Sequence, residues 1–114
     1  MARFQIERLG QIEPVPCHCG ASRRAFLDDP AQTATLHRLT VGEATQTHYH
    51  KKATEIYYVL AGTGQIELDG QSFDIGEGDS VLIHPGCRHR AVGKLELLVI
   101  PIPAHDPSDE FFDE

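Results

Sequence analysis

The sequence has no tryptophan, three cysteines and no long hydrophobic run. An odd number of cysteines does not make a disulfide framework, which excludes the small disulfide-stapled proteins. The longest apolar stretch, residues 97–103, is too short to cross a bilayer and contains prolines, so no membrane-spanning segment is expected. The N-terminal residues lack the apolar centre of a signal peptide, and a cytoplasmic location is the default expectation.

Basic residues are also scarce. Ten lysines and arginines against 17 acidic residues give a net charge of -7. Nucleic-acid binding needs a basic surface, so this balance argues against a nucleic-acid partner. The length of 114 residues and the absence of an internal repeat favour one domain over residues 1–114, with an apolar fraction of 40% that is ordinary for a globular protein.

Residues 42–62 bring two histidines and a glutamate together. His48 and His50 are separated by one residue, and alternate side chains of an extended strand leave the same face. The same spacing on a helix would splay them, and the threonines and tyrosines nearby favour a strand. Residues 51–54 can turn the chain, which would return Glu55 beside the histidines. Two imidazoles and a carboxylate on one wall suit a divalent transition metal.

A second stretch, residues 78–93, supplies a further histidine. His89 follows a Pro85-Gly86 turn and starts a short predicted strand over residues 89–92. Such a strand can face the first wall across a barrel.

The two glycine-framed stretches, residues 42–62 and 78–93, resemble the two sequence motifs of the cupin family. The sequence departs from the second motif at His84, where a proline is expected, and at Gly93, where an asparagine is frequent. Neither departure touches a ligand position. The resemblance implies an all-β fold, the cupin double-stranded β-helix or jelly-roll barrel.

The resemblance also implies one divalent transition metal ion inside the barrel. Carried over position by position, its ligands are His48, His50, Glu55 and His89. Iron, manganese, nickel, zinc, cobalt and copper all accept this donor set, so the sequence does not name the metal. Binding should weaken below about pH 6, because neutral imidazole is the ligand.

The rest of the chain reads as short strands separated by turns. A short edge strand over residues 4–9 is one reading of the N-terminus. Glycines at residues 62–64 predict a tight reversal, and Asp69-Gly70 is a strong hairpin signal. At least eight strands without a helical pattern indicate a closed barrel or jelly roll. The other predicted strands cover residues 22–27, 33–41, 65–68, 71–75, 80–84 and 95–102.

The sequence does not settle whether several further side chains face the cavity. His37 is interpreted as a non-ligand, and one of Arg23, Arg24 and Arg38 could reach the cavity and hold an anionic substrate. Tyr57 lies two residues past Glu55 and should face the same interior, as a catalytic hydrogen-bond or proton donor or as part of the wall.

Gln46, two residues before His48, is also expected to point inward. Cys17 and Cys19 are expected to be neither bonded to each other nor zinc ligands, because alternate strand residues lie too far apart and no second ligand pair exists. The acidic tail, residues 105–114, carries Phe111 and Phe112 and is interpreted either as docked or as frayed.

Two functions follow. The first is a small metal-dependent enzyme of the dioxygenase, isomerase or lyase type, acting on a small oxygen-rich molecule. The second is a non-catalytic module that binds or senses such a molecule. The outer face of the strand around residues 55–60 also carries Ile56, Tyr58 and Leu60, and this apolar face predicts a homodimer.

Overall fold

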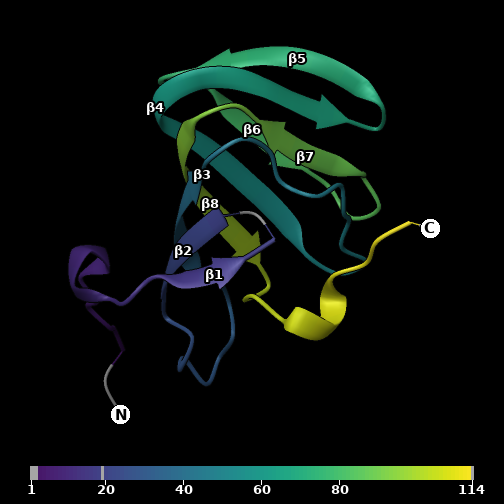
Figure 1. Cartoon of the computed structure of the whole chain (residues 1–114). Helices are drawn as coiled ribbons and strands as arrows, with labels where there is room; N and C mark the ends of the chain where they lie inside the picture. The colour runs from purple at the N-terminus through teal and green to yellow at the C-terminus, as the bar shows by residue number, and fades with distance from the viewer. Residues whose placement is uncertain (1–2, 19, 114) are drawn as a thin grey trace.

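Strand β4 (Thr54–Leu68) joins the two halves of the barrel in the computed structural model, which describes residues 3–18 and 20–113. The first half of β4 lies between β6 (Ser80–Ile83) and β8 (Leu95–Ile102). Its second half lies between β5 (Gln71–Gly76) and β7 (His89–Val92). One strand therefore belongs to both sheets of the barrel (Figure 1).

Three more strands extend one sheet on the far side of β8. They are β1 (Val15–Cys17), β2 (Gly20–Ala25) and β3 (Leu36–Val41), and the strand order is β1-β2-β3-β8-β4-β5, with every pairing antiparallel. Two short 3-10 turns, η1 (Leu9–Gln11) and η2 (Pro107–Asp109), flank the strands. The predicted all-β jelly roll is confirmed.

The core consists of alternate residues from both sheets. Leu95, Leu97 and Val99 of β8 are buried, whereas the residues between them are only partly buried. The alternation arises because successive side chains of a strand leave opposite faces. Val59 and Ile66 contribute to the same cluster from the two halves of β4, so this strand links the packing of both sheets.

The reversal predicted at residues 62–64 is wrong, because β4 bends there and continues. Its pairing with β8 shifts between Val59 and Ala61, and Gly62 adopts a φ of 92°. A Cβ on Gly62 would lie 2.2 Å from the Lys94 carbonyl oxygen. The glycines therefore allow a close backbone approach at a bend. The true reversal is at Asp69-Gly70, as predicted, where both residues have positive φ.

Strand ends near the N-terminus also differ from the prediction. Residues 4–9 form no strand, and the chain there leads into η1. β2 ends at Ala25 because Phe26 has a φ of 69°, which is not extended. Residues 45–50 form isolated bridges instead of a regular strand, so side chains do not alternate, and Gln46 is exposed, contrary to its predicted inward position.

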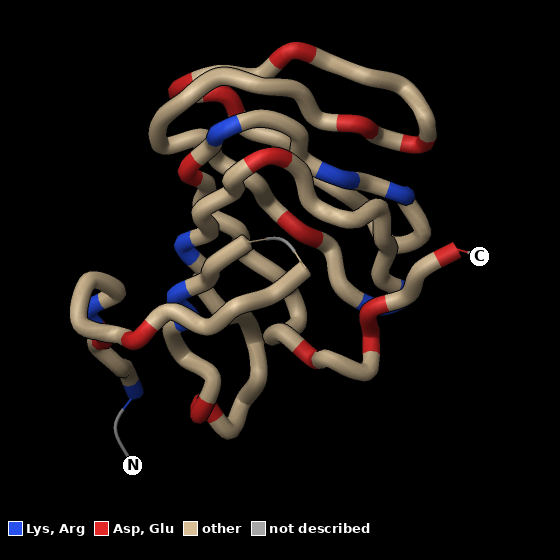
Figure 2. Tube along the Cα trace, in the orientation of Figure 1, with Lys and Arg blue, Asp and Glu red and all other residues tan. Residues whose placement is uncertain are grey.

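Charged side chains of both signs are interspersed along the trace (Figure 2). Three surface arginines have carboxylate partners: Arg38 with Glu96, Arg88 with Asp113, and Arg90 with Glu67. Within residues 3–18 and 20–113, no helix is both long and apolar enough to cross a membrane.

Candidate metal centre and pocket

Four side chains converge inside the barrel and are called the histidine–glutamate cluster below: His48, His50, Glu55 and His89. Glu55 projects from the start of β4, and His89 opens β7. His48 and His89 exchange two backbone hydrogen bonds of 3.1 and 2.9 Å, which fixes their side chains next to each other. One ligand atom from each of the four residues lies within 4.8 Å of the others.

Backbone carbonyls orient the three imidazoles. The Nδ1 atoms of His48, His50 and His89 lie 2.8, 2.6 and 2.9 Å from the carbonyl oxygens of Gln46, Asp109 and Cys87. A carbonyl oxygen only accepts, so each Nδ1 carries the proton. Each Nε2 is then directed to the cluster with its lone pair available when the imidazole is neutral. Such outer hydrogen bonds are the usual way that histidine ligands are held.

The inner atoms of the cluster have no hydrogen bonds of their own. The Nε2 atoms of His50 and His89 lie 3.0 and 3.1 Å from Glu55 Oε1, within ion-pair distance, but all three atoms are buried without a hydrogen-bond partner. Buried polar atoms normally have partners, so these three atoms form a polar site without its partner. A divalent cation would satisfy all of them, and the donor set suits a transition metal.

The same residues have shifted pKa values. Burial lowers the pKa of His48 to about 4. Burial also opposes a charge on His50, but the adjacent Glu55 carboxylate outweighs it and raises the pKa to about 9. Burial alone would raise the pKa of Glu55, yet His50 and His89 lower it well below its usual range. Without a metal, a proton on His50 balances the Glu55 charge.

Tyr57 lines the pocket next to the cluster, as its position two residues after Glu55 predicts. Its ring centroid lies 5.8 Å from that of His89. Burial raises the pKa of its hydroxyl well above the ordinary value, so the phenol is neutral. Within the described part of the chain its hydroxyl has no hydrogen-bond partner, which leaves it free to meet a ligand.

The acidic tail docks against the cluster. The Asp109 carboxylate accepts hydrogen bonds from the backbone N–H groups of Lys51, Lys52 and Ala53 at 2.9 to 3.1 Å, and it is buried. Phe111 pairs with Tyr49 through two backbone hydrogen bonds of 3.0 Å. Of the two readings of the tail, docking is therefore correct, and docking places the carbonyl that orients His50.

Docking also brings Glu110 into the pocket, which sequence reasoning missed. Its carboxylate pairs with His18 Nε2 and lies 3.9 Å from His48 Nε2. The contact with His18 lowers the pKa of Glu110, so the carboxylate is ionised. His18, His48 and Glu110 form a second group with metal-ligand spacing, but it shares His48 with the first. A single Nε2 serves one ion, so the two groups are alternatives.

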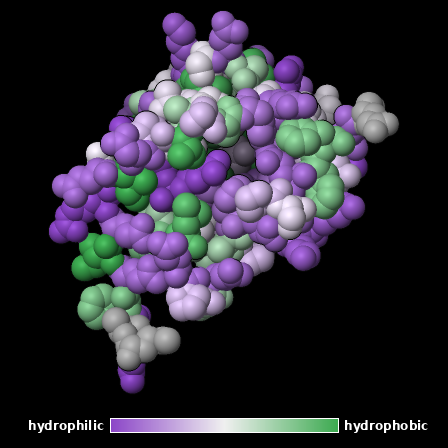
Figure 3. All heavy atoms as spheres, turned by 60° about the horizontal axis from the view of Figure 1, so that its bottom comes forward, coloured by the Kyte–Doolittle hydropathy of each residue, from purple (hydrophilic) through white to green (hydrophobic). Residues whose placement is uncertain are grey.

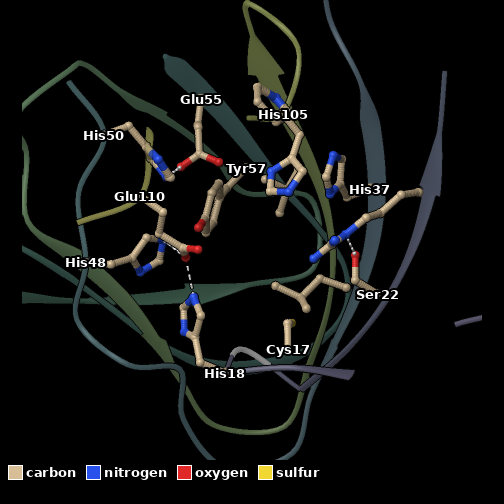
Figure 4. A pocket seen from close by; sticks show the side chains of 14 residues that line it. Cys17, His18, Ser22, His37, His48, His50, Glu55, Tyr57, His105 and Glu110 are labelled. Atoms are coloured by element: carbon tan, nitrogen blue, oxygen red, sulfur yellow. Dashed lines mark hydrogen bonds and ion pairs between the residues drawn. The ribbon is translucent and has the colours of Figure 1, made fainter. Parts of the chain in front are cut away.

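A polar patch faces the cluster from the other side of the pocket. Figure 4 shows Ser22, His37 and His105 opposite His48 and His50, and Arg24 lines the pocket with them. His37 is buried and bonded to Thr35, which agrees with its assignment as a non-ligand.

Of the three arginines left open, only Arg24 reaches the cavity. Arg23 donates to the carbonyls of Gly10 and Ile12, and Arg38 pairs with Glu96. β2 and β3 thus direct one arginine inward and two outward.

The cavity has a volume of about 70 Å³. Ligand pockets are commonly larger than roughly 300 Å³. The partly exposed side chains of His18 and Glu110 lie on its border, where their displacement would enlarge it. Figure 3 shows a hollow on the face turned forward, bordered mostly by hydrophilic residues.

Cys17 is disulfide-bonded, but the prediction concerns its pairing with Cys19, and that part stays a prediction. That prediction assumed extended geometry beyond Cys17, whereas β1 ends at Cys17 and the chain turns at His18. Cys19, the other residue of the prediction, lies outside the described residues. Cys87 is a free thiol.

Comparisons with known proteins agree with this architecture. The family described as "Cupin domain" matches residues 35–101. A crystal structure from Planctomyces limnophilus is 40% identical and superposes with a TM-score of 0.90, covering 97% of this chain and 98% of that one. The Streptomyces nucleoside dehydratase Pac13 superposes with a TM-score of 0.81 over 95% of this chain and 89% of that one, at 21% identity, which shows likeness of fold.

Among curated proteins, MJ1618 of Methanocaldococcus jannaschii is 36% identical over 62 residues, which are 53% of this chain and 50% of that protein. SchB of Streptomyces halstedii is 33% identical over 76 residues, 62% of this chain and 55% of that protein. The chain spans about half the length of these curated relatives.

Proposed function

The chain belongs to the cupin domain family, and we propose that it is a metal-dependent enzyme acting on a small oxygen-rich molecule. The histidine–glutamate cluster would hold one divalent transition metal ion. Three inner atoms of the cluster support this assignment, because they are buried without hydrogen bonds: His50 Nε2, His89 Nε2 and Glu55 Oε1. A metal ion held there supplies Lewis-acid polarisation of a substrate oxygen.

Two pocket side chains have complementary proton chemistry. Tyr57 is neutral and holds its proton at a hydroxyl without a described partner, so it is the proposed donor to the substrate. Glu110 is ionised and lies near His48, so its carboxylate is the proposed acceptor. A neutral acid and an ionised base bordering one cavity suit proton transfers such as those of an isomerase or a lyase.

The fold alone does not select a reaction. Pac13 is a nucleoside dehydratase, and this supports an enzyme in general but not the same substrate. The second candidate, a binding or sensing module, is favoured by the small cavity, which suits capture of a compact ligand.

Elemental analysis of purified variants tests the metal site. Wild-type protein should carry a single ion per chain, and His50→Ala and His89→Ala should each lose most of it, because each removes one of four ligands. His84→Ala is the matched control, since His84 is exposed and outside the cluster. Unchanged metal content and affinity in His50→Ala would show that the assignment is wrong.

Turnover separates the two functions. Metal-loaded protein is screened against small hydroxy, keto and carboxy compounds in steady-state assays, with isothermal titration of the same compounds. The enzyme proposal expects turnover that Tyr57→Phe reduces without changing metal content. Tight binding with no turnover of any bound compound would favour the module.

We also propose that the chain pairs as a homodimer through the outer face of β6, β4 and β8. Leu82 of β6 pairs with Ile56 of β4, which pairs with Ile100 of β8, so apolar side chains form a row across three strands. Leu82 and Tyr58 are 59% and 40% exposed. A second copy would cover this row.

A further inference from the structure

Arg24 is the arginine whose surroundings are unusual. It lines the pocket and is partly buried, yet it has no ion pair with any residue that the structure describes. Three other arginines, at positions 38, 88 and 90, each have a carboxylate partner on the surface. A buried cation usually has an anionic partner, because desolvation of an unpaired charge is costly.

Desolvation is visible in the electrostatics of Arg24. Burial lowers the pKa of its guanidinium, and the field of Glu110 opposes that shift. The guanidinium remains charged at neutral pH, because its ordinary pKa is far above 7. Glu110 acts from a distance and forms no ion pair with Arg24 within the described residues. The charge of Arg24 is therefore only partly compensated inside the pocket.

The neighbours of Arg24 are neutral hydrogen-bonding groups. Its Nε donates to Ser22 Oγ at 3.3 Å, and Ser22 is buried. Its two terminal nitrogens have no hydrogen bond to any described residue. The planar fork of a guanidinium matches carboxylate and phosphate oxygens in a bidentate manner, so these free donors are suited to an anionic group.

Two imidazoles complete this end of the pocket. The rings of His37 and His105 lie 5.1 Å apart between their centroids. The His105 backbone N–H donates to Thr35 Oγ1 at 3.0 Å, and that hydroxyl lies 2.8 Å from His37 Nε2. When the hydroxyl donates to His37 Nε2, the ring keeps its proton on Nδ1 as a further donor. Burial lowers the pKa of His37 to about 3, so the ring is neutral.

We propose that Arg24, supported by Ser22 and His37, is the binding site for an anionic group of the ligand, a carboxylate or a phosphate. The site faces the histidine–glutamate cluster across one small cavity (Figure 4). The ligand is thus a compact anion whose other end carries an oxygen for the cluster. The inference that the ligand also carries an oxygen for the cluster rests on the proposed function, whereas the anion site itself does not.

The experiment uses metal-free, 15N-labelled full chain, so that the anion site is tested without the metal site. Acetate and inorganic phosphate are titrated at constant ionic strength, and the side-chain Nε–H signals of the arginines are followed. We expect saturable shifts for Arg24 and for the Ser22 amide. Arg23 is an internal control on the same strand, because its guanidinium binds backbone carbonyls outside the pocket. Stronger binding of one probe identifies the anion class.

Variants separate a specific site from general charge attraction. Arg24→Gln should weaken binding by roughly tenfold or more, because it removes charge-assisted hydrogen bonds. Arg24→Lys should bind with intermediate affinity, and Arg23→Gln should bind like wild type. Equal losses in Arg23→Gln and Arg24→Gln, or wild-type binding by Arg24→Gln, would overturn the proposal.

Glu110→Gln should change anion affinity in the opposite direction from Arg24→Gln, and it keeps Arg24 intact. It removes the negative charge that lies within the field of Arg24, so both probes should bind several-fold more tightly. Weaker binding by Glu110→Gln would contradict the proposal even if Arg24→Gln failed to fold.

Discussion

Among single residues, His50 makes metal affinity depend on pH, because it carries a proton that a metal ion must displace. The pKa of His50 is raised to about 9, whereas that of His48 is lowered to about 4. Between these values His48 is neutral and His50 carries a proton in metal-free protein. A metal ligand must be deprotonated, so binding has to displace this proton.

Metal affinity should therefore rise with pH well above the range of an ordinary histidine. Below the raised pKa of His50, one proton is released per ion, and the apparent affinity should increase about tenfold per pH unit until pH nears 9. Isothermal titration in two buffers of different ionisation enthalpy measures the released proton. Affinity that is constant from pH 7 to 9 would contradict the assigned charge state.

Pocket residues that lie close together in the chain were predictable from their spacing, whereas those that are far apart were not. The spacing of His48, His50 and Glu55 predicts a shared wall, because local strand and turn geometry is sufficient for that inference. Glu110 and His18 escaped prediction because their contact joins positions 92 residues apart. Arg24 could not be separated from Arg23 by sequence, since the alternation of apolar residues around them is ambiguous.

At the scale of elements, the C-terminal segment over residues 105–113 functions as a structural clamp on the cluster. Asp109 anchors it by accepting three backbone N–H groups of the turn between His50 and Glu55. Its carbonyl also orients His50. The sequence alone left docking and fraying of the tail as alternatives. The groups that anchor Asp109 are backbone amides, which leave no sequence signature.

Removing this anchor should destabilise the protein. Asp109→Ala leaves three backbone N–H groups without their acceptor, and we expect a loss of roughly 1–3 kcal/mol in the free energy of unfolding. Urea denaturation of metal-free protein measures it. Asp113→Ala is the control in the same segment, because Asp113 forms only a solvent-exposed ion pair with Arg88, which contributes little to stability. Equal stability of Asp109→Ala and wild type would mean that the anchor is dispensable.

The strands themselves were more predictable than their connections. Alternation and turn residues located β5, β6 and β8 and the Asp69-Gly70 hairpin. The reversal predicted from the glycines at 62–64 was wrong because a glycine is typical both of a reversal and of a close backbone approach. Only the position of the Lys94 carbonyl beside Gly62, a long-range fact, distinguishes the two.

In the whole molecule, residues 3–18 and 20–113 leave Tyr58 and Leu82 on the outer face of β6, β4 and β8 exposed. The tail is engaged elsewhere, since Phe111 stacks on Tyr49 and Phe112 contacts His18. The N-terminal segment is held at β2 through Arg23, and its Phe4 is 72% exposed. Neither segment removes the exposure of Tyr58 and Leu82, which leaves a second copy as the proposed cover.

Sedimentation equilibrium should accordingly give a dimer mass at micromolar concentration. Tyr58→Glu should shift the equilibrium toward monomer, because the variant would bury a carboxylate without a partner at the centre of the row. Phe73→Glu is the matched control, as Phe73 is similarly exposed but lies on β5, outside this face. A monomer mass for wild type ends the dimer proposal. Equal weakening by both variants would place the contact elsewhere, since a two-fold contact through this face leaves Phe73 outside it.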